Sequence, residues 1–450
     1  MKRTGITKRM GSLLVQIVLA MSFLCGCSSK SQDISVDAVD GVRRGIKLLG
    51  EAFVERPVEY EPCTLRFSWK QDETKNQAFL QVIEEFEQAY PGILVEGSGV
   101  EEENWEEVLL DQLSDQTAAD INQISWEWIQ EYSADGSLFY DLYKEYEVLN
   151  LGTFGQEYLN LCTVAEELQA IPAAVTGRIF LFDATLFEQA GIPVPSTLQE
   201  LMDAGESFRV QLGEEYYPLA LNTTDRMELL IYYLGSQYGK DWIVNGVLQY
   251  DVEEVTKGME FLLSLEELHV IPTLQYMKSA DSLVRDSGFN SGCYGGVFVK
   301  EDSLKQYQAS LQAGHKIQAG QRFTDMGIYN GGYVQVAVAY AVSENCAHPR
   351  EAAIFLNFLL NQEESILVLK DTQGIPLSRV AGNFGKEQEL WDKTAWEANQ
   401  TILEDDFAEN PELAASIRDD SVYKDVLNGL SYGDYNAREA AQLLLDGLNQ

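Results

Sequence analysis

Residues 64–69, TLRFSW, and residues 86–95, FEQAYPGILV, contain the pattern that decides the fold class. The first stretch alternates polar and apolar side chains, which predicts a half-buried strand. Apolar residues then recur at helical spacing from residue 79 to residue 90, and the Pro-Gly pair at 91–92 ends that helix. Residues 93–95, ILV, predict the next strand. The order strand, helix, strand indicates an α/β fold with a parallel sheet and right-handed crossovers.

The same kind of pattern continues along the chain. Apolar residues at helical spacing over 105–113 are followed by residues 121–124, INQI, which predict a short buried strand. That strand delivers residues 125–128, SWEW, to its carboxyl end, where open α/β sheets bind ligands. Residues 333–342, YVQVAVAYAV, predict a central strand, because ten residues are too few to span a membrane. The sequence after Pro349 is mostly helical in pattern.

The composition indicates a folded, strongly acidic protein. The chain has 450 residues, with 32 Lys and Arg against 71 Asp and Glu, and a formal net charge of −39. An apolar content of 45%, with 11% aromatic residues, is too high for a disordered acidic chain. This length predicts two or three domains, of which we expect two lobes. The negative charge repels nucleic acid and anionic lipid surfaces, so neutral or cationic ligands are favoured and no nucleic-acid partner is expected.

Residues 1–26 have the form of a secretory signal. Four basic residues within 2–9 precede an uncharged apolar stretch at 11–24, which is short for a spanning helix. A permanent membrane anchor is the alternative. Residues 24–27, Leu-Cys-Gly-Cys, resemble a bacterial lipobox, which implies that Cys27 becomes the lipidated first residue of the mature protein. Residues 27–60 are then a tether, and two acyl chains would hold the protein stably at the extracellular face of the cell membrane.

The remaining cysteines and the histidines show no metal-ligand spacing, so the sequence predicts no metal site and no cofactor. We interpret the cysteines as buried free thiols, with one or two disulfides as the alternative in an exported protein. The residues concerned are Cys63, Cys162, Cys293, Cys346, His269, His315 and His348.

Signatures of catalysis are missing from the sequence. Residues 235–240, GSQYGK, are one residue too short for a phosphate-binding loop and lack the Ser or Thr that holds magnesium. There is no Gly-x-Ser-x-Gly nucleophile elbow. With 71 acidic residues, carboxylate pairs of the glycosidase kind arise by chance and carry no signal. We therefore expect a protein that is not an enzyme.

Ten short segments carry a common pattern: 65–69, 86–95, 119–123, 136–142, 171–172, 182–193, 196–201, 348–353, 358–361 and 374–376. In their order along the chain, they resemble the bacterial extracellular solute-binding protein family 1, the carbohydrate-type receptors of ABC importers. Three features depart from the family pattern: Phe182-Asp183 replaces Tyr-Asn, Gln373 stands where relatives often have Arg, and residues 70–75 replace a Trp-Gly-Gly loop.

The resemblance implies a periplasmic-binding-protein-like fold of type II, with two discontinuous α/β lobes joined by hinge strands. The N-terminal lobe would contain residues 61–172 and 326–378, and the C-terminal lobe residues 173–325 and 379–450. The chain would cross between them near residues 171–178 and near residues 323–328. The resemblance also implies a monomeric receptor that traps a sugar between its lobes by hinge closure and delivers it to ABC permease subunits.

A sugar presents apolar C–H faces to aromatic rings and hydroxyls that need hydrogen-bond partners, so we expect aromatic and polar residues in the site. Trp69, at a strand end, is the expected stacking platform. Of Trp126 and Trp128, one is expected to face the cleft, and the family's matching loop favours Trp128. The predicted ligand-binding residues are Trp69, Asp72, Glu127, Trp128, Tyr294, Tyr329, Tyr333 and Gln373.

Three other functions remain open at this point. The same fold would bind a cationic ligand such as a polyamine through carboxylates and aromatic faces. The absence of the Trp-Gly-Gly loop keeps this hypothesis open. A surface glycan hydrolase would need two carboxyls about 5–10 Å apart across a cleft, one of them with a raised pKa. A ligand-sensing partner of a membrane receptor has the same sequence features as a transport receptor.

Overall fold

The computed structural model describes residues 58–101, 105–277, 283, 286–409, 411–418 and 420–449. The predicted signal segment, Cys27 and nearly all of the predicted tether lie outside these residues. In the described part of the chain, no single helix is long and apolar enough to cross a membrane. Helices α13 (Pro349–Asn361) and α14 (Glu363–Leu369) together have the length and composition of a membrane span, but they are bent by 61° relative to each other.

The first lobe is built on three parallel strands, β1 (Cys63–Lys70), β2 (Ile93–Val100) and β3 (Ile121–Ile124), with β1 in the middle. Helix α3 (Glu73–Ala89) connects β1 to β2 and buries its apolar face. Helix α4 (Trp105–Ser114) leads on to β3. The strands and helices predicted from residues 64–124 are therefore confirmed.

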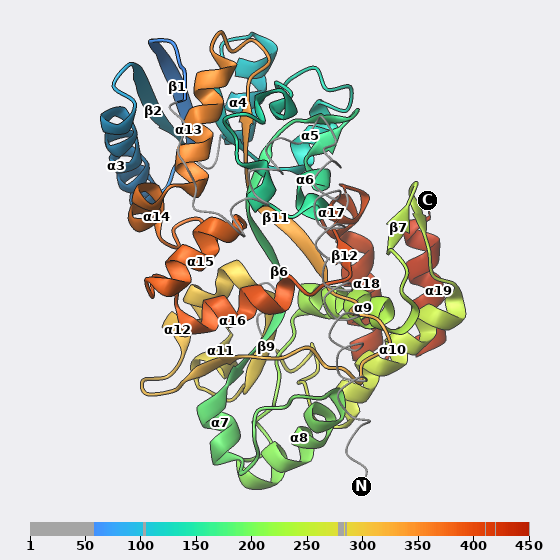
Figure 1. Ribbon diagram of the computed structural model, residues 1–450. Helices are drawn as coiled ribbons and strands as arrows, with labels where there is room; N and C mark the ends of the chain where they lie inside the picture. Colours follow the sequence, from blue (N-terminus) through green and yellow to red (C-terminus); the bar gives the residue numbers. More distant parts are fainter. Residues whose placement is uncertain are drawn as a thin grey trace, which may run out of the picture.

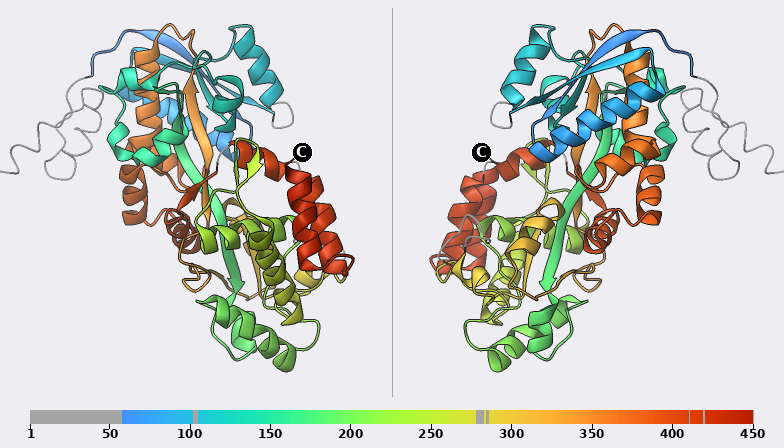
Figure 2. Two further views of the ribbon diagram at one scale, coloured as in Figure 1. Left: turned by 90° about the vertical axis from the view of Figure 1, so that its right-hand side faces the viewer. Right: turned by 90° about the vertical axis from the view of Figure 1, so that its left-hand side faces the viewer.

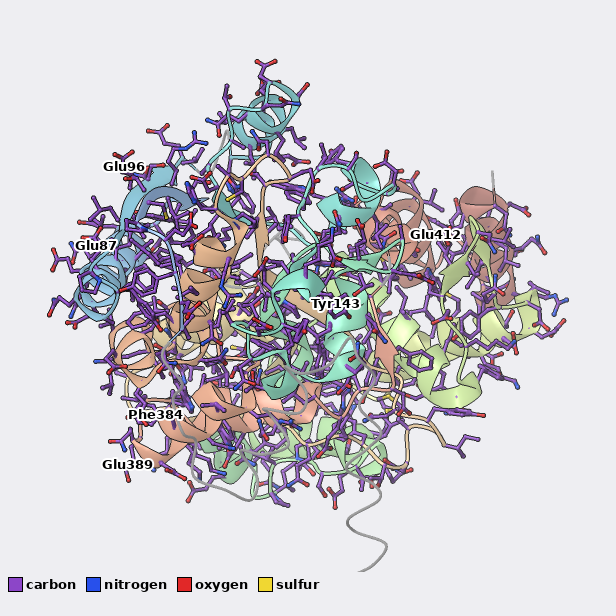
Figure 3. The ribbon with its side chains drawn as sticks, turned by 45° about the horizontal axis from the view of Figure 1, so that its top comes forward. Glu87, Glu96, Tyr143, Phe384, Glu389 and Glu412 are labelled. Atoms are coloured by element: carbon purple, nitrogen blue, oxygen red, sulfur yellow. The ribbon has the colours of Figure 1, made fainter. Side chains whose placement is uncertain are left out.

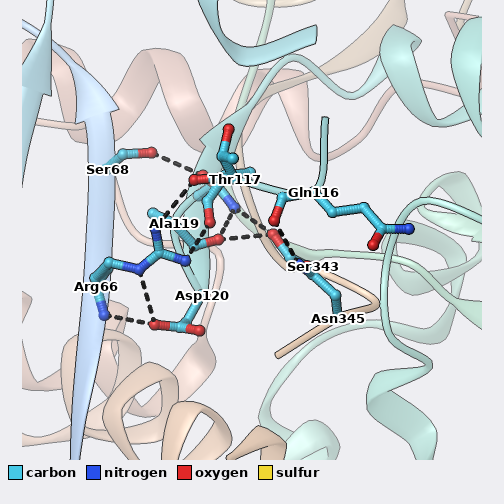
Figure 4. A network of polar contacts seen from close by, with 10 residues as sticks. Arg66, Ser68, Gln116, Thr117, Ala119, Asp120, Ser343 and Asn345 are labelled. Atoms are coloured by element: carbon cyan, nitrogen blue, oxygen red, sulfur yellow. Dashed lines mark hydrogen bonds and ion pairs between the residues drawn. The ribbon is translucent and has the colours of Figure 1, made fainter. Parts of the chain in front are cut away.

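Strand β11 (Tyr333–Val342) completes this sheet from a distant part of the sequence. It runs antiparallel to β3 on one side and to β6 (Ile171–Asp183) on the other, giving the order β10-β6-β11-β3-β1-β2. The central strand predicted at 333–342 is confirmed. A polar network ties these strands together, because Asn122 of β3 contacts both Ser68 of β1 and Ser343 after β11 (Figure 4).

Strand β6 passes from one lobe into the other. Residues 171–177 pair with β11, whereas residues 178–183 pair with β9 (Gly296–Lys300) and with β10 (Ile317–Ala319). In Figure 1 this strand runs downward from the part of the molecule around α13 to the part around α7. Residues 320–332 then return the chain from β10 to β11, and this return includes the second expected crossing.

Two large apolar cores lie against β6: the first follows it from Ile171 to Leu181 and reaches Val297 of β9, and the second lies at its far end. The first includes the inner faces of β1, β3, β11, α3 and α13, and the second surrounds Phe180 and Phe182 at the far end of β6. Both views in Figure 2 show β6 linking the two halves. The helices of the second core are α7 (Ala184–Gln189), α8 (Leu198–Gln211), α9 (Thr223–Tyr238), α10 (Val252–Glu267), α18 (Ser421–Tyr432) and α19 (Ala437–Leu448).

Of the two helices that follow residue 378, one packs against the first lobe and the other against the second. Helix α15 (Arg379–Glu387) packs against α13 and α14 of the first lobe, although the boundary placed it in the C-terminal lobe. Helix α16 (Lys393–Ile402) packs along β6 and β10. Helix α15 buries Ala381 with Ile366 and Ile375 rather than in the second core, so we propose that the lobe boundary lies after α15.

The remaining elements are short. Helix α5 (Glu127–Tyr132) follows β3, and α17 (Pro411–Arg418), near the C-terminus, contacts it. The four described cysteines are free thiols. The other short elements are η4 (Leu142–Glu145), η5 (Leu151–Thr153), α6 (Gln156–Leu161), β4 (Thr163–Val164), β5 (Glu167–Leu168), β7 (Ile243–Val244), β8 (Val247–Leu248), α11 (Ser287–Asn290), η7 (Glu301–Ser303), α12 (Leu304–Ser310) and β12 (Phe407–Ala408).

Candidate functional site

Polar side chains gather on one face of the sheet where β6 changes partners. The register places Arg178 of β6 opposite Lys300 of β9, and Thr176 of β6 opposite Gln335 of β11. Opposed residues in antiparallel strands project from the same face, and residues two apart on one strand do so too. These four side chains therefore share one face at the junction of the lobes.

Arg178 forms a buried ion triad with helix α9. Its Nη1 lies 2.7 Å from Asp225 Oδ1 and its Nη2 lies 3.0 Å from Glu228 Oε1, and Nη1 also donates to the Phe298 carbonyl. Burial by itself lowers the pKa of Arg178, but the charges of Glu228 and Asp225 outweigh burial and raise it. Burial raises the pKa of Asp225 to about 6. Because a broken buried pair is costly, the triad fixes α9 to the hinge strand.

A chain of hydrogen bonds links the two lobes next to this triad. Lys300 Nζ, at the end of β9, donates to Gln335 Oε1 at 2.6 Å. Gln335 Nε2 in turn donates to Glu127 Oε1 at 3.3 Å, and Glu127 begins helix α5 of the first lobe. The amide of Gln335 thus connects a cation of the second lobe to a carboxylate of the first.

Glu409 adds a further acidic group to this place. Its backbone N–H donates to the Val334 carbonyl at 2.8 Å, and the residue is only 2% exposed. Burial raises the pKa of Glu409 to about 8, with smaller increases from the charges of Glu228 and Glu127, against Lys300 and Arg418, which lower it. Glu409 is therefore largely protonated at neutral pH and can donate a hydrogen bond.

We call these residues the interlobe polar cluster; they are Glu127, Thr176, Arg178, Asp225, Glu228, Lys300, Gln335 and Glu409. Several polar atoms in it or beside it are buried without a hydrogen-bond partner, which is uncommon in folded proteins. The cluster offers carboxylates, an ammonium group, an amide and a hydroxyl, so it can bind a hydroxyl-rich ligand. The unpartnered atoms are Thr176 Oγ1, Arg178 Nε, Glu228 Oε2, Tyr333 OH and Glu409 Oε2.

Two of the predicted ligand-binding residues lie at this cluster. Glu127 belongs to it, and Tyr333 lies on β11 two residues before Gln335, on the same face, with its hydroxyl buried and unpartnered. Trp126 and Trp128 are both buried at the start of α5. Trp128 packs on Trp105, with ring centroids 4.6 Å apart, whereas Trp126 has an unpartnered indole N–H. This contrast favours Trp126, rather than the predicted Trp128, as a ligand donor.

Trp69 lies in the core of the first lobe. It is 1% exposed, its ring packs against Phe67 and Phe79, and its Nε1 donates to Asn76 Oδ1 at 2.6 Å. The indole has no free face and no free donor, so this placement favours a packing role over the predicted stacking role.

The other four predicted residues are dispersed. Asp72 caps α3 by accepting from the Lys75 N–H. Tyr294 is buried, and Asp286 acts on it through a side-chain hydrogen bond. Tyr329 is 44% exposed near Gly239 at the end of α9, and Gln373 accepts from the Tyr340 hydroxyl. The structure does not bring these residues together with Glu127.

Most of the acidic side chains responsible for the net charge lie elsewhere. Figure 3 shows Glu87, Glu96 and Glu389 at the edge of the molecule, on or beside α3, β2 and α15. Glu96 and Glu389 are exposed, and Glu87 is half-buried and accepts from the Val95 N–H; none of them belongs to the interlobe polar cluster.

Two discontinuous α/β lobes that share a continuous hinge strand define a binding protein of the type II periplasmic class. More particularly, residues 70–365 match the model of the bacterial extracellular solute-binding protein family, and the chain belongs to this family. The predicted family and fold class are therefore confirmed. It is a family of binding proteins, not of enzymes.

Several solved structures resemble this chain, whereas no curated protein sequence matches it. A periplasmic solute-binding protein from Pectobacterium atrosepticum is 25% identical, with 86% of this chain and 98% of that chain covered and a TM-score of 0.74. A periplasmic oligogalacturonide-binding protein from Yersinia enterocolitica, in complex with saturated digalacturonic acid, is 25% identical, with coverages of 86% and 100% and a TM-score of 0.69. A de novo designed cysteine esterase is also 25% identical, with coverages of 87% and 98% and a TM-score of 0.80.

Proposed function

We propose that this protein is the lipid-anchored receptor of an ABC importer and that it binds a neutral sugar or oligosaccharide between its lobes. The observation that supports this most directly is the interlobe polar cluster. Groups from both lobes converge there on the strand that joins the lobes, so a ligand bound to them would favour the closed arrangement. Lipidation at Cys27 and delivery to the permease belong to the same proposal.

The chemistry of the cluster fits hydroxyl groups. A bound hydroxyl needs both a donor and an acceptor, since a buried unpaired polar group costs about 1–3 kcal/mol. Glu127 and Glu228 supply acceptors, Lys300 and protonated Glu409 supply donors, and Trp126 and Tyr333 add aromatic surface. Several of these atoms are buried and unpartnered, so the ligand would satisfy them at little cost in reorganisation.

The charge balance of the cluster argues for a neutral sugar rather than an acidic one. Arg178 is already paired with two carboxylates, so the cations left near Glu409 are Lys300 and Arg418. The Yersinia protein is in complex with digalacturonic acid, whose carboxylates would meet this acidic surrounding unfavourably. We therefore expect this receptor to prefer uncharged oligosaccharides.

The carboxylates at the cluster favour one second candidate, a cationic ligand such as a polyamine. Ammonium groups would pair with Glu127 and Glu228 and would stack on nearby aromatic faces. In that case Glu409 would lose its proton when the ligand binds.

A thermal-shift panel on the full chain tests both candidates. The panel contains neutral oligosaccharides, saturated digalacturonic acid and spermidine, each at several concentrations, because a ligand that binds only the native state raises Tm with concentration. We expect a neutral oligosaccharide to raise Tm and digalacturonic acid to leave it unchanged. A shift with spermidine alone would reject the sugar proposal, and a shift with digalacturonic acid would reject its preference for neutral ligands.

A further inference from the structure

Three side chains of metal-ligating type meet at the beginning of strand β1, at the opposite end from the carboxyl ends of the parallel strands. Cys63 is the first residue of β1, and His348 and Glu351 open helix α13. One potential ligand atom from each residue lies within 4.8 Å of the others. Their 285-residue separation in sequence explains why spacing alone predicted no metal site.

The helix positions two of the three groups. His348 is the N-cap residue of α13 and Glu351 lies three residues later, so both side chains share one face of the first turn. His348 Nδ1 lies 3.9 Å from Glu351 Oε2. The other oxygen, Glu351 Oε1, accepts from the Glu61 N–H at 2.8 Å. This hydrogen bond orients the buried carboxylate and leaves Oε2 directed toward His348.

We propose that Cys63, His348 and Glu351 bind a zinc ion. Thiolate sulfur, imidazole nitrogen and carboxylate oxygen are the ligands that Zn²⁺ prefers. In a tetrahedral site with Zn–S of about 2.3 Å and Zn–N or Zn–O of about 2.0–2.1 Å, the ligand atoms lie about 3.3–3.6 Å apart. The ligand atoms need to approach one another by up to about 1.5 Å, which rotamer adjustment of the half-buried Cys63 and His348 toward Glu351 provides.

The surroundings favour a cation and offer a fourth ligand. The charges of Glu351, Asp120 and Glu61 all act on the Cys63 thiol. Cys346 interacts with Cys63 and with Asp120 but lies outside the group of three. In the proposed site, Cys346 or a water molecule supplies the fourth ligand. Asp120 itself is already engaged, because it accepts from the Arg66 N–H and pairs with the Arg66 guanidinium (Figure 4).

The three residue types also form nucleophilic triads, but the geometry here does not fit one. A triad needs a hydrogen bond between His and the carboxylate, and 3.9 Å is too long for it. A bound zinc ion would instead join the first residues of the described chain to α13. The site is independent of the interlobe polar cluster, so it extends the proposed function without depending on it.

Metal binding by the full chain tests the proposal. Cys25 and Cys27 are replaced by Ser in every sample, because these two thiols would bind metal themselves. Zinc is titrated by calorimetry, and Co²⁺ replaces it to reveal the thiolate-to-cobalt charge-transfer absorption. We expect one equivalent of zinc and, at a free concentration 100 times Kd, a Tm increase of about 5 °C.

Matched variants assign the ligands. Cys63→Ser and His348→Ala should weaken zinc binding at least 10-fold, and each should abolish or reduce the charge-transfer band. The control is Cys293→Ser, which removes a half-buried thiol in the other lobe and should change neither quantity. Cys346→Ser should weaken binding less than Cys63→Ser. If Cys63→Ser fails to fold, as circular dichroism would reveal, His348→Ala and Glu351→Gln serve instead.

Two results would overturn the zinc proposal. The first is equal zinc binding by the parent chain and by His348→Ala. The second is a thiol count two lower than expected in non-reducing conditions with no zinc uptake after reduction, which would indicate a Cys63–Cys346 disulfide. Neither result bears on the ligand panel, since that panel reports on the interlobe polar cluster.

Discussion

Gln335 joins the two lobes through a single side chain. Its carbonyl oxygen accepts from Lys300 and its amide donates to Glu127, so it orients a cation and an anion at once. It is the only polar side chain other than tyrosine hydroxyls in the run YVQVAVAYAV. A polar residue inside an apolar strand is a signal that the sequence offered and that the predicted site did not use.

Replacing Gln335 tests the role of this amide. We expect Gln335→Leu to weaken ligand binding about 10-fold, because hydrogen bonds to charged groups contribute about 1.5–3 kcal/mol each. Calorimetric titration with the ligand identified in the thermal-shift panel measures the effect. Gln318→Leu, on the exposed side of β10, is the matched control and should bind normally. Equal affinities in both variants would remove Gln335 from the site.

The raised pKa of Glu409 predicts how the stability of the protein depends on pH. Its pKa is about 8 in the folded protein against an ordinary value of 4.5, so the folded state holds a proton that the unfolded state has lost. This contribution to the free energy of unfolding is present below about pH 4.5 and is lost as the pH rises through about 8. Glu409→Gln should therefore flatten the decline of Tm over that range.

The control for this experiment is Glu412→Gln, an exposed carboxyl labelled in Figure 3. Glu412→Gln should leave the pH profile of Tm unchanged. Asp225 and Glu301 have pKa values raised to about 6 and about 7 and act with the same sign. Glu409→Gln should therefore remove the decline between about pH 7 and 8 and only part of it at lower pH. An unchanged profile in Glu409→Gln would contradict the burial argument.

A Trp69→Ala variant distinguishes a packing role of this side chain from a role in stacking on a ligand. Replacing it by Ala should lower the free energy of unfolding by about 3–5 kcal/mol, since a large buried side chain leaves a cavity. Ligand affinity of the folded variant should stay within about twofold of wild type. Denaturant unfolding and calorimetry measure the two quantities, and a large loss of affinity at unchanged stability would restore the stacking role.

At the scale of elements, the strands and helices of the first lobe were predictable because each carries a clear period of apolar residues. The placement of Trp69 followed from the same period, since Leu65, Phe67 and Trp69 alternate on one face, yet Ser68 on the other face is buried too. Strand β1 lies between β3 and β2 and is buried on both faces at residues 67–69. The spacing of its apolar residues therefore does not tell whether Trp69, at the end of the strand, packs in the core or faces a ligand. Lys300 and Glu409 were missed because only the tertiary fold brings them to Gln335.

Gly177 marks the point where β6 exchanges β11 for β9. A Cβ atom at this position would lie 2.9 Å from Ile402 Cγ2 and 3.0 Å from the Tyr333 carbonyl oxygen. We expect Gly177→Val to lower the free energy of unfolding by about 1–3 kcal/mol, because a backbone atom cannot move aside cheaply. Gly382→Ala in helix α15, where the nearest atom lies at 3.4 Å, should be neutral or stabilising. Chemical denaturation measures both, and an equal result would show that β6 tolerates the added volume.

At the scale of the whole molecule, the proposed tether and the two-lobed body would have separate tasks. The proposal of lipidation at Cys27 predicts that Cys27→Ser releases the protein from the membrane fraction of cells that express it. Cys25→Ser, two residues earlier, should remain in that fraction. Cell fractionation with detection of the chain measures this. Retention of Cys27→Ser would support the permanent anchor instead.

Strand β11 also has a consequence for biosynthesis. Asn122 and Ser343 are 221 positions apart, yet they contact each other inside the first sheet, between β3 and the end of β11. Contacts at such sequence separation form slowly. During synthesis the first lobe therefore lacks its central strand until more than three quarters of the chain has emerged. Late completion would keep the polypeptide unfolded for translocation. Because the first sheet combines distant segments of the chain, neither lobe is expected to be obtained as a stable contiguous fragment.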